Sequence, residues 1–268
     1  MTTPRFLVVN ADDFGASTGV NRGILEAHTK GVVTSTSFMV TGAGADEAVA
    51  MAHDHPSLSV GLHWDIVGED EREFDSYDWD AVRREFRDQI ARFEDLFGRP
   101  PTHIDSHRHQ HRQPHLRPVF RELVEPMGIP LRDDGRVQFV GDFYAQWEWR
   151  VTDLSKISVD AFLGLLERRV PPGWTEIACH PGYPSDDYTA VYLDEREHEV
   201  RTLTDPRLRE RIDDLGIRLV GYADYPSGVR AEGQDARRSS GAAPAEGRRP
   251  GGPAGVPAAT ERRAMDGP

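Results

Sequence analysis

A short hydrophobic run that ends in two adjacent aspartates constrains this chain more than any other feature. Residues 6–9 are four consecutive apolar positions, a pattern typical of a strand buried on both faces of a parallel sheet. The acid pair Asp12 and Asp13 follows, and Gly15 then allows the chain to turn sharply. Ligands of α/β folds bind at the carboxyl ends of the strands, so the sequence places this acid pair where chemistry is done.

The two carboxylates need not share one task. Successive residues of an extended segment point in opposite directions, so one of them can hold a metal while the other stays free as a base. A solvated turn is the alternative interpretation of any isolated pair of aspartates. The other polar groups at predicted strand ends favour the functional interpretation here.

Strands and helices alternate along the chain, which predicts parallel βα units in a barrel or an open doubly wound sheet. About seven strands are expected, at residues 6–9, 32–40, 58–66, 102–106, 129–132, 175–179 and 217–221. Helices are expected at residues 17–30, 46–53, 81–97, 116–127, 159–169 and 205–215. Residues 69–80 are predicted as a loop, and the aromatic-rich residues 137–149 have no clear pattern.

The composition of the chain changes near residue 229. The remaining residues are mainly Gly, Pro, Ala, Ser and Arg and have no apolar periodicity. Such a segment cannot bury enough surface to offset the entropy lost on ordering. We therefore predict one folded domain over residues 1–228 and a disordered tail over residues 229–268.

Charge and cysteine content exclude several classes of protein. The formal net charge of −13 argues against a nucleic-acid partner, because phosphate binding requires a basic surface. No apolar run approaches the roughly 20 residues of a membrane span, and the N-terminus lacks a secretory pattern. The single cysteine, Cys179, fits a reducing compartment, so we predict a cytoplasmic protein with no membrane partner.

Histidines cluster where further strands are predicted to end. His63 closes the segment at residues 58–66, and His180 follows residues 175–179. Five groups of one segment occupy alternate positions: His103, Asp105, His107, His109 and His111. Any extended part of that segment turns them to one side. With Asp12 and Asp13 they converge on one rim of the predicted sheet, although a chance His-rich loop remains an alternative.

Two imidazoles and one carboxylate with open coordination positions suit a catalytic divalent metal. Such a metal lowers the pKa of bound water to about 7 and polarises a carbonyl oxygen. The second aspartate could then take a proton from the water, and His180 could protonate the leaving group. These groups indicate hydrolysis of an amide or an ester.

Seven motifs occur in a fixed order between about residues 5 and 225. They are Val-Asn-Ala-Asp-Asp-Phe-Gly, Gly-Ile-Leu-Glu-Ala, Gly-Val-Val-Thr-Ser-Thr-Ser, Gly-Leu-His, Pro-Thr-His-Ile-Asp-Ser-His-Arg-His, Gly-Ile-Pro-Leu-Arg and His-Pro-Gly-Tyr. As a set these motifs resemble the YdjC/ChbG-like carbohydrate deacetylases. The resemblance implies an α/β protein with a single distorted β/α barrel. It also implies metal-dependent removal of an N-acetyl group from an amino sugar or a short oligosaccharide.

The resemblance also implies a role for individual residues. The metal ligands would be Asp13, His63 and His107. Asp12 would be the base and His180 the acid. Arg132, in Gly-Ile-Pro-Leu-Arg, could orient Asp12 and lower its pKa, or form a purely structural ion pair.

Substrate and metal identity stay open at this point. Magnesium, zinc, manganese and cobalt are all compatible with such a site, with magnesium or zinc expected. The sequence Trp64-Asp65-Ile66 departs from the aliphatic continuation expected after Gly-Leu-His. Four aromatic residues could stack on a sugar ring or lie in the core: Trp64, Tyr144, Trp147 and Trp149. A homo-oligomer is possible.

Three other functions were weighed. His103, Asp105 and His180 mimic the two-histidine, one-carboxylate site of Fe(II) oxygenases, but that site normally lies on an all-β fold. A single-metal phosphoesterase on a β/α barrel is closer to the pattern. The non-enzymatic alternative is a catalytically inactive sugar-binding protein, which the presence of all five metal and catalytic candidates disfavours.

Overall fold

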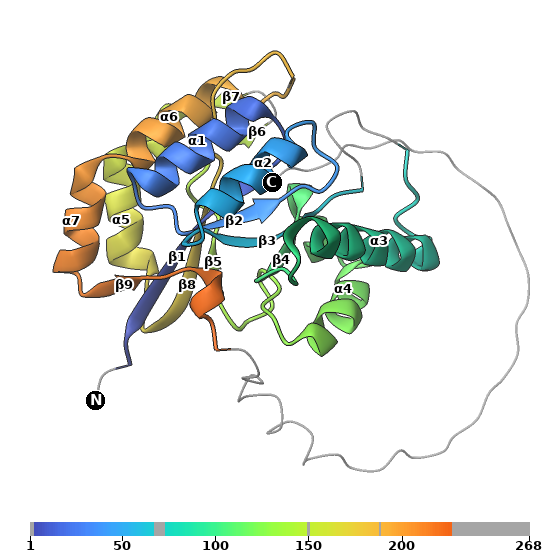
Figure 1. The fold of residues 1–268 in the computed structure, drawn as a ribbon. Coiled ribbons are helices and arrows are strands. Elements are labelled where there is room, and N and C mark those ends of the chain that lie inside the picture. The colour runs from blue at the N-terminus through green and yellow to red at the C-terminus, as the bar shows by residue number, and fades with distance from the viewer. Residues whose placement is uncertain (1–2, 67–72, 149–150, 188, 227–268) are drawn as a thin grey trace, which may run out of the picture.

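A curled, parallel sheet of seven strands forms the centre of the protein (Figure 1). The computed structural model describes residues 3–66, 73–148, 151–187 and 189–226. The strands are β1 (Arg5–Phe14), β2 (Ser35–Phe38), β3 (Ser59–Trp64), β4 (Ile104–Ser106), β5 (Gln138–Val140), β8 (Gly173–Cys179) and β9 (Ile217–Leu219). Their order is β4-β3-β2-β1-β8-β5, with β9 also paired to β1. Every pair in this sheet is parallel, as the alternation of strands and helices predicts.

The sheet curls into an open barrel, and a short segment of the chain connects its two edges. Leu131 forms a parallel bridge to Ile104 at the β4 edge. The chain then reaches the opposite edge by Gln138, where β5 begins beside β8. The predicted distorted barrel is therefore confirmed, with a gap between these edges in place of a closed ladder.

Helices cover the outside of the curled sheet, with α5 and α7 on one side and α3 and α4 on the other (Figure 1). The helices are α1 (Thr18–Thr29), α2 (Ala45–Asp54), α3 (Trp79–Phe97), α4 (Arg117–Val124), α5 (Val159–Arg169), α6 (Asp194–Leu203) and α7 (Pro206–Asp214). A separate antiparallel pair joins β6 (Gln146–Glu148) to β7 (Val151–Thr152). Among the described residues, none of the helices is both long and apolar enough to cross a membrane.

Local sequence signals set the helix ends. The side chain of Ser17 accepts a hydrogen bond from the backbone N–H of Val20, which caps α1. The side chain of Asp78 caps α3 in the same way, and Gly98 ends that helix in the left-handed region at φ 64°. One face of α3 is buried through Val82, Phe86, Phe93 and Phe97, and each fully buried side chain of this size stabilises the fold by about 1.5–3 kcal/mol.

Strand β1 is the central strand because three others pair with it. It pairs with β8 from Arg5 to Ala11, with β9 over its first residues, and with β2 from Asn10 onward. From Leu7 onward its apolar residues are fully buried, as expected for a strand covered on both faces. All strands that pair with β1 run parallel to it, so the carboxyl ends of β1, β3, β4 and β8 lie at one edge.

The structure differs from the sequence prediction in two places. Residues 129–132 form a single bridge and not a strand, because Pro130 has no N–H and the chain turns after Arg132 through a left-handed Asp133 (φ 59°). Helix α6 was not predicted, since its sequence is mainly polar. The predicted boundary near residue 228 and the tail at residues 229–268 lie outside the described residues.

Candidate metal centre

A bulge at the end of β1 accompanies the approach of both neighbouring aspartates to His63. Ala11 pairs with Thr36 and Phe14 with Phe38, so two residues of β1 lie opposite one residue of β2. Asp13 takes a left-handed conformation with φ 71°, which a residue other than Gly rarely adopts. As a result, carboxylate oxygens of both Asp12 and Asp13 lie within 4.8 Å of ring nitrogens of His63. The two carboxylates nevertheless have different further partners.

Gly15 completes this turn. It has φ +93°, and a Cβ atom at this position would lie 2.8 Å from the ring of Phe38. Its N–H donates to the side chain of Asn21, 2.8 Å away. The turn thus holds the end of β1 against α1.

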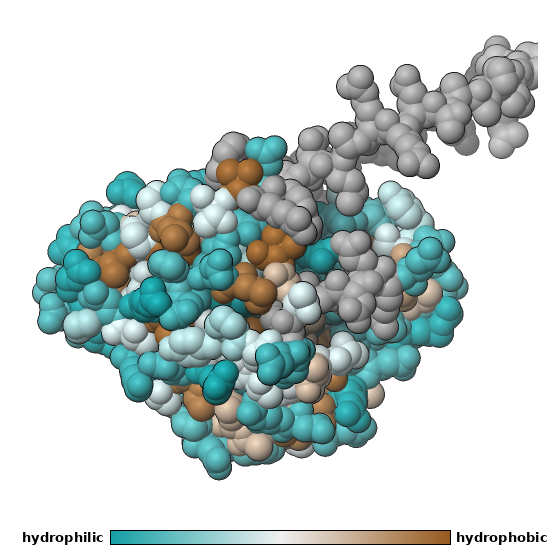
Figure 2. All heavy atoms as spheres, turned by 90° about the horizontal axis from the view of Figure 1, so that it is seen from above, coloured by the Kyte–Doolittle hydropathy of each residue, from teal (hydrophilic) through white to brown (hydrophobic). Residues whose placement is uncertain are grey.

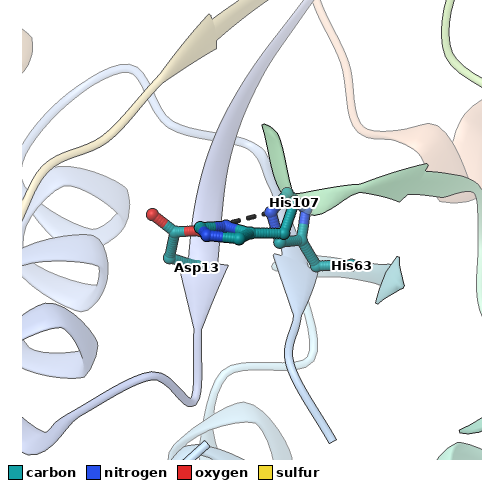
Figure 3. Close-up of side chains that lie close together, drawn as sticks. All are labelled: Asp13, His63 and His107. Carbon is teal, nitrogen blue, oxygen red and sulfur yellow. Dashed lines mark ion pairs between the residues drawn. The ribbon is translucent and has the colours of Figure 1, made fainter. Parts of the chain in front are cut away.

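Asp13, His63 and His107 converge on one point (Figure 3). The Oδ1 atom of Asp13 lies 3.2 Å from Nε2 of His63 and 3.3 Å from Nδ1 of His107. All three residues are buried, and their ligand atoms lie within 4.8 Å of one another. The donor set of two imidazoles and one carboxylate fits a catalytic divalent metal. The structure therefore brings together the three residues that were predicted as ligands.

The register between β3 and β4 orients His63. It places Asp105 beside His63, and Nδ1 of His63 lies 2.7 Å from Oδ1 of Asp105. This contact leaves Nε2 directed at Asp13, the carboxylate–histidine arrangement that supports many metal ligands. Burial disfavours a charged His63, but Asp105 outweighs it and raises the pKa of His63 well above its usual value.

A guanidinium from α6 holds the other oxygen of Asp13. Arg196 donates to Oδ2 of Asp13 over 2.6 Å, and both side chains are buried. Burial alone would raise the pKa of Asp13. The charge of Arg196 and the contacts with His107 and His63 outweigh burial and hold the pKa of Asp13 well below its usual range. Asp13 is therefore ionised and available to a cation.

Asp12 belongs to a different cluster, built around Arg132. The guanidinium of Arg132 donates to both oxygens of Asp12, each over 2.7 Å. It also lies 2.6 Å from Asp105 and 2.6 Å from Glu176 of β8. Burial would raise the pKa of Asp12, but the charge of Arg132 lowers it overall.

A second group of possible ligands, Asp12, His63 and Asp105, already contains a cation. Arg132 contacts both of its carboxylates and fills the role that a metal would have there. Its guanidinium also lies over the ring of Phe139, 5.1 Å from the ring centre. Only the group around Asp13 is left for a metal.

The charges around both clusters leave room for a divalent cation. Four buried carboxylates lie here: Asp12, Asp13, Asp105 and Glu176. Two buried guanidiniums contact them: Arg132 and Arg196. If all four carboxylates are ionised, two negative charges remain without a fixed cation, and buried charges of one sign are costly. The raised pKa of His63 indicates the same deficit, since a proton stabilises the site where no metal is bound.

His180 follows β8 and lies on the side of Asp12. Its Nε2 atom is 3.8 Å from Oδ2 of Asp12, and its side chain is 21% exposed. Its backbone N–H donates to Glu199 of α6 over 2.5 Å. Burial lowers the pKa of His180 to about 4, against the opposing influence of Asp12. His180 is therefore neutral at pH 7 and is the candidate residue that solvent reaches.

The alternating histidines do not all face the site. His103 and Asp105 share the hydroxyl of Ser37 and so lie on one side. Beyond β4 the chain enters a 3-10 helix, His107–Arg112, in which Arg108 and His109 are left-handed. The extended geometry ends there, so the alternating row does not continue to His109 and His111.

Only one of the three other histidines is open to a substrate. His103 is buried and stacked on Tyr222 at 4.0 Å, and His111 is buried beside Ser106. His109 is half-buried, with its ring against that of Phe139.

The aromatic residues considered for sugar stacking or for the core also differ in burial. Trp64 is fully buried and packs on Phe120 at 4.8 Å, so it belongs to the core. Tyr144 is half-buried, 5.3 Å from the ring of His180 and stacked on Tyr192. The side chain of Trp147 and the whole of Trp149 lie outside the described part of the chain.

Sequence reasoning missed three charged residues of this region. They are Glu176, Arg196 and Glu199. Glu176 lies in a strand that was predicted, but an isolated acid in a strand carries no signal for its partner. Acidic residues in the first turn of α6 and Arg201 in its last turn are a signal that could have indicated a helix.

A cavity of about 640 Å³ lies away from this centre. Its lining includes Leu58 and Thr102, which lie just before β3 and β4, and Tyr222, which follows β9. The cavity is therefore at the amino edge of the sheet, opposite the candidate metal centre.

Comparisons with known proteins agree with this geometry. A family model described as YdjC-like protein matches residues 6–214. The chain is 34% identical to a carbohydrate deacetylase of Geobacillus stearothermophilus, over 83% of this chain and 98% of that protein. It is 33% identical to a chitooligosaccharide deacetylase of Serratia marcescens, over 82% of this chain and 99% of that protein.

A solved structure from Enterococcus faecalis V583, named as a cellobiose-phosphate cleavage protein, is also similar. Its TM-score is 0.72 at 28% identity, and the match covers 82% of this chain and 98% of the other. The family match at residues 6–214 includes Asp12, Asp13, His63, His107, Arg132 and His180.

Proposed function

The chain belongs to the YdjC-like protein family, and on this premise we propose that it is a metal-dependent carbohydrate deacetylase. Its substrate would be an N-acetylated amino sugar or a short oligosaccharide, hydrolysed at the amide bond. The relatives named as carbohydrate and chitooligosaccharide deacetylases support this substrate class.

The cluster of Asp13, His63 and His107 carries the proposal, because three buried ligand atoms lie within 4.8 Å of one another. When bound there, a divalent metal would supply a water of lowered pKa and polarise the amide carbonyl. Imidazole ligands suit zinc better than magnesium, which prefers oxygen. We therefore favour zinc over magnesium.

Asp12 is the proposed base. Its charge is maintained by Arg132, whose two N–H groups fix both oxygens, while Oδ2 keeps a lone pair for an incoming proton. Asn10 donates a further hydrogen bond to Oδ1 over 2.9 Å. Asp12 is thus pre-oriented before the substrate binds.

His180 is the proposed acid. The 3.8 Å between its Nε2 and Oδ2 of Asp12 is too long for a hydrogen bond, so one bridging water would carry the proton from Asp12 to His180. Because burial lowers the pKa of His180 to about 4, its protonated form gives the proton up readily to the leaving nitrogen. The amide bond then breaks to acetate and a free amine.

The carboxyl edge of the sheet is the proposed sugar-binding face. Viewed from above, hydrophobic residues lie near the middle of this face among hydrophilic ones (Figure 2), and a sugar also has apolar and hydroxyl-bearing sides. Tyr144, beside His180, is the aromatic candidate for stacking. A cytoplasmic location and a possible homo-oligomer stay predictions.

Acetate release from N-acetylglucosamine and its oligomers tests the proposal. The purified protein should release acetate and free amine after addition of zinc or magnesium, and a chelator should abolish the release. Full activity in the metal-free protein would contradict the metal assignment. Phosphate release from a sugar phosphate, without acetate release, would favour the phosphoesterase alternative.

A further inference from the structure

We propose that Arg196 is a positioning residue that restricts Asp13 to one metal-binding oxygen and so keeps a coordination position open. The inference rests on the proposed metal site but not on the identity of the substrate. It concerns a residue of α6 that no motif of the sequence indicated.

The two oxygens of Asp13 have different partners. Oδ1 faces the ring nitrogens of His63 and His107 at 3.2 and 3.3 Å. Oδ2 faces the opposite way and accepts a hydrogen bond from Arg196 over 2.6 Å. Charge-assisted bonds of this length are among the strong hydrogen bonds of proteins, so Oδ2 is already engaged.

Arg196 cannot easily leave this position. Its Nε atom donates to the backbone oxygen of Tyr192 over 2.9 Å, and its guanidinium lies 5.9 Å from the ring centre of that residue. Gly182 packs against it so closely that a Cβ there would lie 3.0 Å from the Cδ atom of Arg196. The side chain of Arg196 is only 4% exposed. The guanidinium is thus fixed by contacts that do not involve Asp13.

A fixed guanidinium at Oδ2 has a chemical consequence. A metal that bound both oxygens of Asp13 would have to displace Arg196 or approach its positive charge. Only Oδ1 is therefore left for the metal, beside His63 and His107. Three protein ligand atoms leave a position for water or a carbonyl oxygen, which catalytic metal sites require and structural sites lack.

The same helix contacts the other side of the active centre. Glu199 lies one turn beyond Arg196 and accepts the backbone N–H of His180, while Arg196 also donates to the backbone oxygen of His180 over 3.4 Å. Residues three apart on a helix share a face. One face of α6 therefore positions a metal ligand and the proposed acid together.

The test replaces Arg196 by Met, which keeps the length of the side chain and removes its charge and donors. Cobalt(II) serves as the probe, added to metal-free wild-type and R196M protein, with visible absorption as the readout. With both oxygens of Asp13 available, R196M should bind cobalt as tightly as wild type or more tightly. Its cobalt absorption should weaken, as expected for a higher coordination number, and added acetate should change the spectrum less than in wild type.

Turnover of R196M with N-acetylglucosamine oligomers should fall by about 10–100-fold, the usual effect of losing a partner of a metal ligand. Arg196→Lys keeps the charge and should recover part of this loss. Arg201→Gln is the matched control, because Arg201 lies on α6 and forms its ion pair in the described part of the chain with the half-buried Glu197, away from Asp13; its spectrum and turnover should equal those of wild type.

Two results would overturn the inference. Weaker cobalt binding in R196M, together with an unchanged spectrum of the bound form, would mean that Arg196 only supports Asp13 structurally. An unchanged acetate response would mean that the open position does not depend on it. If R196M does not fold, as judged by circular dichroism, Arg196→Gln provides the same measurements with an uncharged donor. A wild-type protein that binds cobalt but releases no acetate would contradict the proposed function and leave the spectral test intact.

Discussion

Asp12 and Asp13 are neighbours in sequence and equally buried, yet their surroundings differ in one respect. Asp12 has its cation built into the chain, because Arg132 binds both of its oxygens. Asp13 has one oxygen held by Arg196 and the other directed at two imidazoles. The Arg132 cluster is therefore complete as folded, whereas the Asp13 cluster keeps one carboxylate oxygen for the proposed metal. The comparison suggests how one acid pair can supply both a base and a metal ligand.

The largest effect on metal content and turnover is expected from substitutions of the proposed metal ligands around Asp13. His63→Ala removes a neutral ligand, and Asp13→Asn removes the anionic one, so metal content should fall to background and turnover with it. Metal analysis and acetate release would both be measured. Added metal should restore part of the rate of Asp13→Asn, because the amide oxygen remains a weak ligand. Normal metal content in either variant would show that these residues are not ligands.

Asp12→Asn should affect turnover without affecting metal. The amide keeps the shape of the side chain but cannot take a proton from water, so turnover should fall by roughly 10²–10⁴-fold. Metal content should equal that of wild type, and excess metal should not restore the rate. If excess metal rescues Asp12→Asn and not Asp13→Asn, the roles of the two aspartates are reversed.

For stability we expect the reverse order: disrupting the Arg132 cluster should lower the free energy of unfolding more than removing the metal from the Asp13 cluster. Arg132→Met leaves Asp12, Asp105 and Glu176 buried without their cation, which should lower the free energy of unfolding by about 3–5 kcal/mol. Removing the metal from wild type should cost less, about 2.7 kcal/mol if the metal was present at 100 times its dissociation constant. Urea unfolding with and without chelator measures both quantities. A larger loss from chelation than from Arg132→Met would contradict the view that the Arg132 cluster is complete without metal.

The smallest effect concerns Glu176. Burial raises the pKa of Glu176 above its ordinary value of 4.5, and Arg132 offsets this only in part. The folded protein therefore binds this proton more tightly than the unfolded chain does, so the contribution of Glu176 to stability falls as the pH rises above about 4.5. Glu176→Gln cannot titrate, and its stability should decline less steeply than that of wild type over that range. If the free energy of unfolding of the two proteins has the same pH dependence, the pKa of Glu176 is not raised.

The sequence predicted the parts of this centre that local patterns encode. Asp13, His63 and His107 each stand at or just after a buried strand, and strand ends can be recognised from a few residues. The helices at residues 17–30 and 81–97 were predicted for the same reason. Such signals depend on neighbours along the chain, so no knowledge of the fold was needed.

The partners of these residues depend on long-range contacts and could not be predicted. Arg196 is 183 residues from Asp13 along the chain, and nothing near Arg196 distinguishes it from the exposed Arg201 of α6. The orientation of Asp13 depends on a bulge against β2, which no pattern within β1 specifies. Residues 129–132 were wrongly predicted as a strand because the turn at Asp133 ends the pairing after one bridge.

The position of β1 in the sheet has a consequence for the order of folding. β1 is made first, but Arg5 pairs with Gly173 and Ala11 with Cys179, so its longest ladder waits for most of the chain to be synthesised. Non-local pairing of this kind is slow, because the intervening chain must be ordered first. We expect β1 to gain its full hydrogen-exchange protection only in the last kinetic phase of refolding, together with β8. The acid pair at its end would then acquire Arg132 and Arg196 in the same phase, so no partly folded intermediate would carry a working active site.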